Sequence, residues 1–301
     1  MADVLVVGSI NQDFLLKVSH RPQPGETVTG AELSLHNGGK GANQAAAASL
    51  LGASVAMLGR VGDDDLGGPL AEALQEKGVD TSLVESVEGE STGAAFIALT
   101  PDGENAITVA PGANRHVRPE DVDAASETIE DARVLVAQME VSAETVSRAV
   151  EVAEINGTRA LVNLAPPMEL SDETLGKLDP LVVNEHEAAF LLGDKVEGVD
   201  GALSAAPELL SLGPRSVVIT LGSNGAVYAD GDATGHVSSP EVEVVDTTGA
   251  GDAFVGALAV KLTANTSLED AVSYAVRAGA AAVTKEGAQG ALPSPETVEK
   301  L

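Results

Sequence analysis

Short apolar runs rich in β-branched residues alternate along the chain with longer amphipathic segments. The runs predict buried strands at Val4–Val7, Val55–Leu58, Val134–Val136, Ala160–Leu164, Leu181–Val183 and Val217–Leu221. The longer segments, several of which follow a Ser, Asp or Asn cap, predict helices at Gly41–Leu51, Leu66–Lys77, Ala143–Ile155, Glu185–Leu192, Ala253–Leu262 and Leu268–Thr284. Such alternation is typical of an α/β fold in which helices cover both faces of a mostly parallel sheet.

Two regions, residues 14–36 and 91–109, do not follow this rhythm. The second contains the turn sequence Pro101-Asp102-Gly103 between two strand-like runs, which predicts a hairpin. We expect both regions to form a small β-sheet outside the main layer, serving as a lid over a site, as an edge that pairs with a second subunit, or as both. Neither a linker nor an internal repeat divides the sequence, so we expect a single domain over residues 1–301.

Acidic residues dominate the charge of the chain, with 46 Asp and Glu against 17 Lys and Arg and a net charge of −29. This surplus repels polyanions and argues against a nucleic-acid-binding surface. It fits either adaptation to high salt or an acidic, Ala-rich proteome, and composition leaves both open. The chain has no cysteine, which excludes disulfides and thiolate chemistry, and its five histidines lack the spacing of a zinc site.

The sequence carries no signal for a membrane or for export. No apolar stretch approaches the ~18 residues that a membrane span needs. The segment Ala2–Gly8 reads as a buried strand and lacks the basic leader and cleavage site of a signal peptide. We therefore expect a cytoplasmic protein with no membrane partner.

The run Asp246–Asp252 carries the strongest local chemical signal. We expect a strand at Glu241–Val245 to enter this turn and a helix to follow it. Gly249 and Gly251 allow backbone N–H groups to approach a ligand, and the helix start adds a positive dipole end, so the segment predicts an anion site. The dipole also favours ionised Asp252, which could then accept an alcohol proton during phosphoryl transfer. Taken alone, however, Asp252 is better explained as a helix cap.

Four other segments place polar residues or glycines at the ends of predicted strands or helices. They are Ser9–Asp13, Asn37–Gln44, Asn184–Glu187 and Thr220–Gly225. Amides, carboxylates and small residues at such ends suit sugar hydroxyls, hydrated magnesium or a nucleotide, but each segment alone is explained as well or better by a capped or tight turn. None is a GxxxxGK[ST] phosphate loop or a GxGxxG dinucleotide fingerprint.

Together and in collinear order, five segments resemble the ribokinase family of sugar kinases. They are VVGSINQD at 6–13, NGGKGANQ at 37–44, NEHE at 184–187, TLGSNG at 220–225 and DTTGAGDAF at 246–254. The resemblance runs from Val4 to about Pro293 and implies a three-layer ribokinase-like α/β sandwich with a β-sheet lid. Segments Pro24–Gly30, Gly89–Gly93 and Lys285–Gln289 further resemble members that use ATP to phosphorylate D-ribose at its 5-hydroxyl.

The resemblance also implies roles for individual residues. Asp252 would be the general base, beside an anion hole formed by Gly249, Ala250 and Gly251. The sugar would contact Asn11, Asp13, Gly39, Lys40, Gly41, Asn43, Glu140 and Asp252. ATP would lie along Asn184, Glu187, Thr220, Leu221, Gly222, Ser223, Asn224, Gly225, Gly251, Asp252 and Val276. Of these, Asn184 and Glu187 would also order magnesium through water.

Potassium, the usual monovalent activator of the family, would be held by the Asp246 carboxylate and by main-chain carbonyls. The carbonyl positions are Thr248, Ala282, Lys285 and Gly287, and Ala291 stands at a further ligand position. Ala291 departs from the family pattern because a serine oxygen is frequent there, so either water replaces that ligand or cation activation is weaker. Val276 likewise stands where relatives often carry a polar side chain, which leaves apolar contacts to hold the adenine. Relatives that dimerise through the lid imply a homodimer.

Two alternatives to ribose phosphorylation stay open. The same chemistry could act on 2-deoxyribose, another pentose, fructose or a nucleoside, although four Phe and two Tyr make a nucleoside pocket harder to build. The chain could instead be a non-catalytic sugar- or nucleotide-binding protein, because a fold alone does not prove activity. Asp252 together with Gly249 and Gly251 opposes this second alternative.

Overall fold

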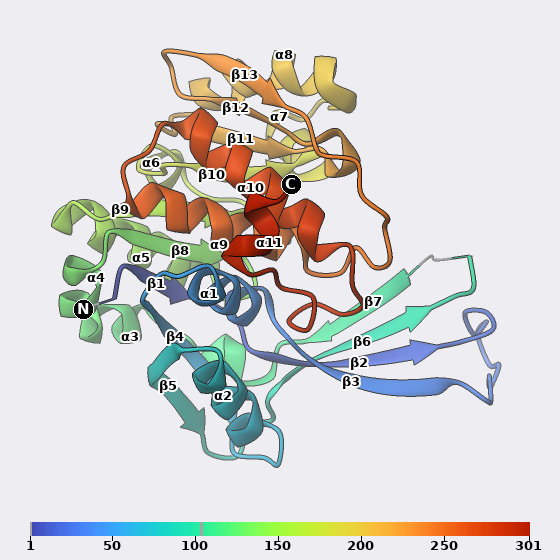
Figure 1. Cartoon of the computed structure of the whole chain (residues 1–301). Helices are drawn as coiled ribbons and strands as arrows, with labels where there is room; N and C mark the ends of the chain where they lie inside the picture. Colours follow the sequence, from blue (N-terminus) through green and yellow to red (C-terminus); the bar gives the residue numbers. More distant parts are fainter. Residues whose placement is uncertain (1, 103–104) are drawn as a thin grey trace.

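In the computed structural model, which describes residues 2–102 and 105–301, a nine-stranded sheet forms the centre (Figure 1). Its strand order is β13-β12-β11-β10-β9-β8-β1-β4-β5. The strands are β1 (Val4–Val7), β4 (Val55–Gly62), β5 (Val79–Val87), β8 (Val134–Gln138), β9 (Arg159–Asn163), β10 (Leu181–Asn184), β11 (Val217–Thr220), β12 (Ala226–Ala229) and β13 (Thr234–Val237). All neighbours from β5 to β11 pair in parallel, and β12 and β13 add antiparallel pairs at one edge. The predicted mostly parallel sheet is confirmed.

Helices cover both faces of this sheet, as the alternating pattern predicts. One face carries α1 (Lys40–Leu50), α2 (Gly67–Glu76), α9 (Ala250–Thr263), α10 (Leu268–Ala282) and α11 (Pro295–Glu299). The other carries α3 (Pro119–Ala124), α4 (Ser126–Asp131), α5 (Ala143–Asn156), α6 (Asp172–Leu175), α7 (Glu185–Leu192) and α8 (Gly198–Ser211). Two 3-10 turns, Gly112–His116 and Gly222–Asn224, complete the described elements. Caps at Ser142, Asn184 and Ser267 each accept a backbone N–H of the helix that follows.

The two regions outside the α/β rhythm form a separate four-stranded sheet, called the lid below. Its order is β3-β2-β6-β7, with β2 at Asn11–Lys17, β3 at Glu32–Gly38, β6 at Gly93–Leu99 and β7 at Asn105–Ala110. Figure 1 shows it projecting to one side of the central sheet. β6 and β7 pair antiparallel, as a hairpin requires. Of the predicted turn, Gly103 lies outside the described residues.

The strand predicted at Glu241–Val245 is wrong. These residues form no strand, and they are mostly exposed although Val and Glu alternate in the sequence. The segment pairs with no strand, and Val245 N–H donates to the carbonyl of Val283 beyond α10 instead. Alternation predicts a strand only where a neighbouring strand is present to accept its hydrogen bonds.

Helices α1 and α9 pack closely against each other on one face of the central sheet. Ala45 to Ala48 on α1 are fully buried, and Gly256 on α9 faces them. A Cβ at Gly256 would lie 2.6 Å from Ala47 Cβ and 2.9 Å from the main chain at Ala48 and at Gln44. The absence of a side chain at Gly256 therefore sets how near the two helices lie.

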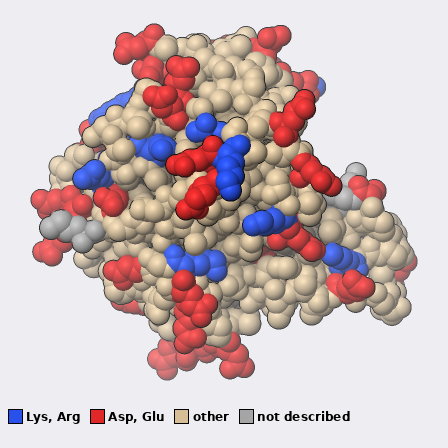
Figure 2. Space-filling view, in the orientation of Figure 1, with Lys and Arg blue, Asp and Glu red and all other residues tan. Residues whose placement is uncertain are grey.

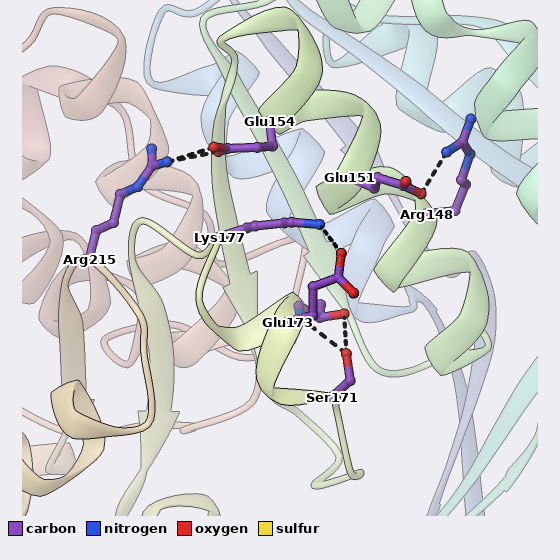
Figure 3. A network of polar contacts seen from close by, with 8 residues as sticks. Arg148, Glu151, Glu154, Ser171, Glu173, Lys177 and Arg215 are labelled. Atoms are coloured by element: carbon purple, nitrogen blue, oxygen red, sulfur yellow. Dashed lines mark hydrogen bonds and ion pairs between the residues drawn. The ribbon is translucent and has the colours of Figure 1, made fainter.

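Charge on the surface is mostly acidic. In Figure 2, acidic side chains are spread over the visible face, and several Lys and Arg lie beside them. Around α5 and α6, three ion pairs lie close together, namely Arg148–Glu151, Lys177–Glu173 and Arg215–Glu154 (Figure 3). Each includes exposed groups that water and salt screen, so these pairs add little to stability. The acidic surplus therefore leaves net repulsion, which added salt screens.

No helix within residues 2–102 and 105–301 combines the length and the apolar character needed to cross a membrane.

We expect Gly256→Ala to lower the free energy of unfolding by about 1–3 kcal/mol, because the added methyl group overlaps Ala47 and the α1 backbone. Denaturant unfolding monitored by circular dichroism measures this change. Gly68→Ala on α2 is the matched control, since a Cβ there meets nothing within 4 Å and alanine favours a helix. Equal effects of the two substitutions would contradict the close-packing argument.

Candidate active site

Asp252 lies in the first turn of α9, directly after the Gly-rich turn. Gly249 precedes the helix with φ of 76°, and a Cβ there would lie 2.9 Å from Ala288 Cα, so both conformation and space require glycine. The first N–H groups of a helix have no intrahelical acceptor and are candidate anion donors, although that of Ala250 donates to Thr247 O at 3.3 Å. The turn thus brings potential anion donors next to a carboxylate.

The Asp252 carboxylate is buried and held by two side-chain amides from α1. Asn43 Nδ2 donates to Oδ2 at 2.9 Å, and Gln44 Nε2 donates to Oδ1 at 3.0 Å. Burial raises the pKa of Asp252 above its ordinary value, while Lys40 and the two amides act in the opposite direction. We expected the helix dipole to favour ionised Asp252, but burial outweighs the dipole and raises the pKa. The neighbouring donors partly offset the cost of ionising a buried carboxylate.

Two further carboxylates, Asp13 and Glu140, lie near Asp252. Burial, with Glu140 and Asp252 adding to it, raises the pKa of Asp13 to about 7. Glu140 Oε2 accepts from Ser9 Oγ at 2.5 Å and from Lys40 N–H at 3.1 Å. Burial lowers the pKa of Lys40, but the charges of Asp252 and Glu140 outweigh it, so its pKa is raised overall. The structure thus brings one ammonium group and three carboxyl groups to the same site.

Glycines allow the start of α1 to approach the β1–β2 connection. A Cβ at Gly41 would lie 2.6 Å from Ser9 N, and one at Gly39 would lie 2.8 Å from Asn11 N. Asn11 is 2% exposed and its Oδ1 accepts from Asn114 Nδ2 at 2.7 Å. The predicted sugar residues of Ser9–Asp13 and Asn37–Gln44 therefore lie side by side in the structure.

A cavity of about 660 Å³ lies beside the start of α9, and Ala250 and Gly251 line it. The other lining residues that the sequence assigned to ATP are Thr220, Gly222, Ser223, Gly225 and Val276. The remaining residues assigned to ATP do not line the cavity, namely Asn184, Glu187, Leu221, Asn224 and Asp252. The cavity is largely apolar where α10 forms its wall, at Val276, Gly279 and Ala280, and where Val283 follows the helix.

Sequence reasoning missed part of this lining. Ser239, Pro240, Glu241, Val242 and Val244 form one side of the cavity. The alternation in Glu241–Val245 was the available signal, but it indicated a strand. Since that segment joins no sheet, its residues line the cavity instead of pairing with a strand.

Asn184 and Glu187 form a reciprocal cap at the start of α7. Asn184 Oδ1 accepts from Glu187 N–H at 2.8 Å, and Glu187 Oε2 accepts from Asn184 N–H at 2.8 Å. Burial raises the pKa of Glu187, which is 5% exposed. Among residues 2–102 and 105–301 no cluster of acidic residues and histidines could ligate a metal directly. Glu187 Oε1 also accepts from Asn184 Nδ2 at 3.0 Å, so the two side chains hold each other in place.

Asp246 ties the Gly-rich turn to the loop that follows α10. Its Oδ1 accepts from Thr248 N–H at 2.9 Å and from Thr248 Oγ1 at 2.7 Å, and its Oδ2 accepts from Gly287 N–H at 2.8 Å. Partial burial opposes ionisation, but these donors hold the pKa of Asp246 below its ordinary value. The chain thus keeps a carboxylate beside Thr248 and Gly287, near the end of α10 at Ala282, whose carbonyl lacks an intrahelical donor.

Known proteins resemble this chain in sequence and in structure. Residues 1–295 match the family described as pfkB family carbohydrate kinase. Curated relatives include ribokinase of Haemophilus influenzae, 37% identical over 98% of this chain and 97% of the relative, and deoxyribokinase of Salmonella typhi, 37% identical over 98% and 96%. The structure of Arabidopsis thaliana ribokinase complexed with ribose and ATP superposes with a TM-score of 0.92 at 32% identity, covering 99% of this chain and 98% of that one.

The resemblance found in the sequence is therefore confirmed along nearly the whole chain. A family match over residues 1–295, supported by close relatives and by a shared fold, shows that this protein belongs to the pfkB family of carbohydrate kinases.

Proposed function

We propose that this protein transfers the γ-phosphoryl group of ATP to the 5-hydroxyl of D-ribose, with Asp252 as the general base. The observation that carries the proposal is the position of Asp252, a buried carboxylate that directly follows two cavity-lining residues and lies in a cluster of amides and carboxyl groups. Ribokinases at 36–38% identity and the structure of one with ribose and ATP support the choice of reaction.

In the proposed reaction the sugar hydroxyl oxygen bonds to the γ-phosphorus while the bond from that phosphorus to the β–γ bridging oxygen breaks. The hydroxyl proton passes to Asp252, and ADP leaves with the bridging oxygen. Backbone N–H groups at Gly249, Ala250 and Gly251 stabilise the charge on the moving phosphoryl group. The cavity reaches Ala250 and Gly251, so this chain offers its anion donors and its base at adjacent positions.

We propose that the sugar binds at Asn11, Asp13, Asn43 and Glu140, with the glycines and Lys40 of the α1 start beside it. Asn43 Oδ1 is buried and has no partner among the described residues, although Nδ2 of the same amide binds Asp252. A buried acceptor without a donor is costly, and a sugar hydroxyl would supply the missing donor. Carboxylates and amides together suit a small polyhydroxylated ligand.

Two cations would assist, and the residues present fit both. Magnesium, held through water by Asn184 and Glu187, would offset negative charge on the ATP phosphates. Potassium would lie among the Asp246 carboxylate and the carbonyls at Thr248, Ala282, Lys285 and Gly287. Ala291 is 1% exposed and supplies only a methyl side chain, so no side-chain oxygen completes the cation site at that position.

The lid gives physical support for the proposed homodimer. Register places Phe14 opposite both Leu35 and Phe96, and Leu16 opposite Leu33, so these apolar side chains share one face. The rings of Phe14 and Phe96 stack at 5.0 Å, while Leu33, Leu35 and Phe96 are 58, 56 and 45% exposed. Such an exposed apolar sheet face is a site for association. Asp13 lies on the opposite face, toward the sugar residues.

Phosphorylation of 2-deoxyribose is the second candidate. Deoxyribokinases match this chain at 37% identity, the same level as the Haemophilus influenzae ribokinase, so overall similarity does not separate the two sugars. Cytoplasmic location, one domain over residues 1–301 and the cation requirements remain predictions.

Coupled release of ADP across a sugar panel, with and without potassium, tests the proposed function. We expect turnover with D-ribose to exceed turnover with 2-deoxyribose, fructose and nucleosides, and potassium to raise it. Faster turnover of 2-deoxyribose would favour the second candidate, while no turnover of any sugar would favour a binding protein.

Asp252→Asn should lower kcat by ~10² or more while sugar binding, measured by calorimetry, is retained, because the amide cannot accept the hydroxyl proton. Asp270→Asn is the matched control, since Asp270 occupies the same third position of α10 and is exposed. Near-normal turnover of Asp252→Asn would exclude Asp252 as the base.

Leu35→Glu should convert the dimer to a monomer, because it places charge in the apolar lid face. Light scattering resolves the two states, since one chain has a mass of 30.3 kDa. Ile155→Glu on α5 is the control, because Ile155 is 71% exposed but distant in sequence and fold from the lid. A monomeric unmodified protein would refute the homodimer.

A further inference from the structure

Gln44 lies behind the candidate base, and neither the sequence motifs nor the proposed sugar and nucleotide contacts give it a role. It belongs to the first turns of α1 and is only 1% exposed. Its Nε2 donates to two acceptors at once, Asp252 Oδ1 at 3.0 Å and Asn163 Oδ1 at 3.2 Å. Both protons of this amide are therefore committed, one to the base and one to the central sheet.

Asn163 fixes the direction in which these hydrogen bonds run. It is the last residue of β9, and its Nδ2 donates to the main-chain carbonyl of Val182 on β10 at 3.3 Å. A carbonyl can only accept, so Asn163 turns its own Oδ1 toward Gln44. That oxygen can also only accept, so Gln44 must present its NH₂ group, and the same group then meets Asp252.

We propose that Gln44 is a positioning residue for phosphoryl transfer, which the chain from Val182 through Asn163 keeps turned so that it donates to Asp252 and holds Oδ1 of the base toward the sheet. This inference rests on the proposed function of Asp252. It makes an amide flip costly, because a flipped Gln44 would set its oxygen against both Asp252 Oδ1 and Asn163 Oδ1.

The two amides that hold Asp252 have different tasks. Asn43 holds Oδ2 and keeps an unpartnered acceptor, Oδ1, which fits a contact with the sugar. Gln44 Oε1 is likewise buried without a partner among the described residues, but Gln44 Nε2 is held from both sides, by Asp252 on α9 and by Asn163 on β9. Loss of Gln44 should therefore reduce the ionised fraction and the fixed position of Asp252 while leaving the sugar contacts in place.

Charges near Asp252 set the expected dependence on pH. Lys40 on α1 favours the ionised form, whereas Glu140 after β8 and Asp13 on β2 disfavour it. A hydrogen bond from Gln44 also favours the ionised form, so its removal raises the pKa of Asp252. A base works only when ionised, and activity should then be lost at a higher pH as the solution is made more acidic.

Gln44→Met tests the proposal because it keeps the length of the side chain and removes both donors. We expect kcat to fall about 10-fold at neutral pH, KM for the sugar to change by less than about 3-fold, and the acidic limb of the kcat profile to move up by about one pH unit. Gln44→Glu should move the limb further, because it sets a second carboxylate beside Asp252. Asn163→Leu, which frees Gln44 to turn, should move it in the same direction by less.

Thr145→Val is the matched control for a structural effect. Thr145 is fully buried on α5, across the sheet, and its hydroxyl donates to Val117 O at 2.7 Å, so the variant loses a buried hydrogen bond away from Asp252. We expect a comparable loss of thermal stability without a shift of the pH profile. A Gln44→Met profile that matches the unmodified enzyme, or a shift of equal size in Thr145→Val, would overturn the proposal.

A ¹³C NMR titration of the carboxyl groups separates this proposal from the proposed function. The Asp252 signal is assigned by its loss in Asp252→Asn, and its pKa is then measured without sugar or ATP. An upward shift in Gln44→Met supports the positioning role even if no tested sugar is phosphorylated. An unchanged pKa together with normal sugar turnover removes the role and leaves the proposed function intact.

Discussion

The close approach of α1 to α9 is the constraint on which the candidate site depends. Gly256 leaves no side chain between the helices, and Ala47 and Ala48 fill the space with single methyl groups. One turn before Gly256, α9 carries Asp252, and one turn before Ala47, α1 carries Asn43. Larger side chains at the contact would separate the helices, and the amide–carboxylate hydrogen bonds would lengthen. Packing of small residues thus determines the geometry of polar ones.

Burial of the base creates an electrostatic cost that the same packing offsets. A site that excludes water protects ATP from hydrolysis, but it also disfavours an ionised carboxylate. Here Asn43, Gln44 and Lys40 all come from the start of α1, and all favour the charged form of Asp252. The start of α1 therefore supplies most of the groups that oppose the effect of burial on the pKa of Asp252. If the sugar binds as proposed, its binding is coupled to ionisation of the base, because Asn43 and Lys40 take part in both.

Much of the fold was predictable because buried strands and amphipathic helices leave periodic patterns. The strand Val4–Val7 and the helix Glu185–Leu192 have the predicted bounds. Short helices such as α6, with four residues, are too brief to show a period of 3.6 and were missed. Glu241–Val245 alternates like a strand but has no neighbouring strand, and a sequence pattern does not show which segments are neighbours in space.

The candidate site was only partly predictable for a related reason. Residues within one motif, such as Gly249 and Asp252, are linked by local geometry, so their roles can be argued from spacing. Gln44 lies 208 residues from Asp252 and 119 residues from Asn163, and it meets both only because α1, α9 and β9 pack together. Nothing in either residue's neighbourhood distinguishes a donor to the base from an ordinary polar helix or strand end.

Side chains alternate between the two faces of the lid, so one strand register determines both its proposed sugar-facing side and its proposed subunit-facing side. Asp13 and Phe14 are successive residues of β2, so their side chains point to opposite faces. The Asp13 face closes toward the sugar residues, and the Phe14 face, with Leu35 and Phe96, is the apolar surface proposed to meet a second subunit. A shift of one residue between β2 and β3 would exchange both faces together. Association through the Phe14 face would resist that shift, so a partner subunit would also stabilise the sugar-facing side of the lid.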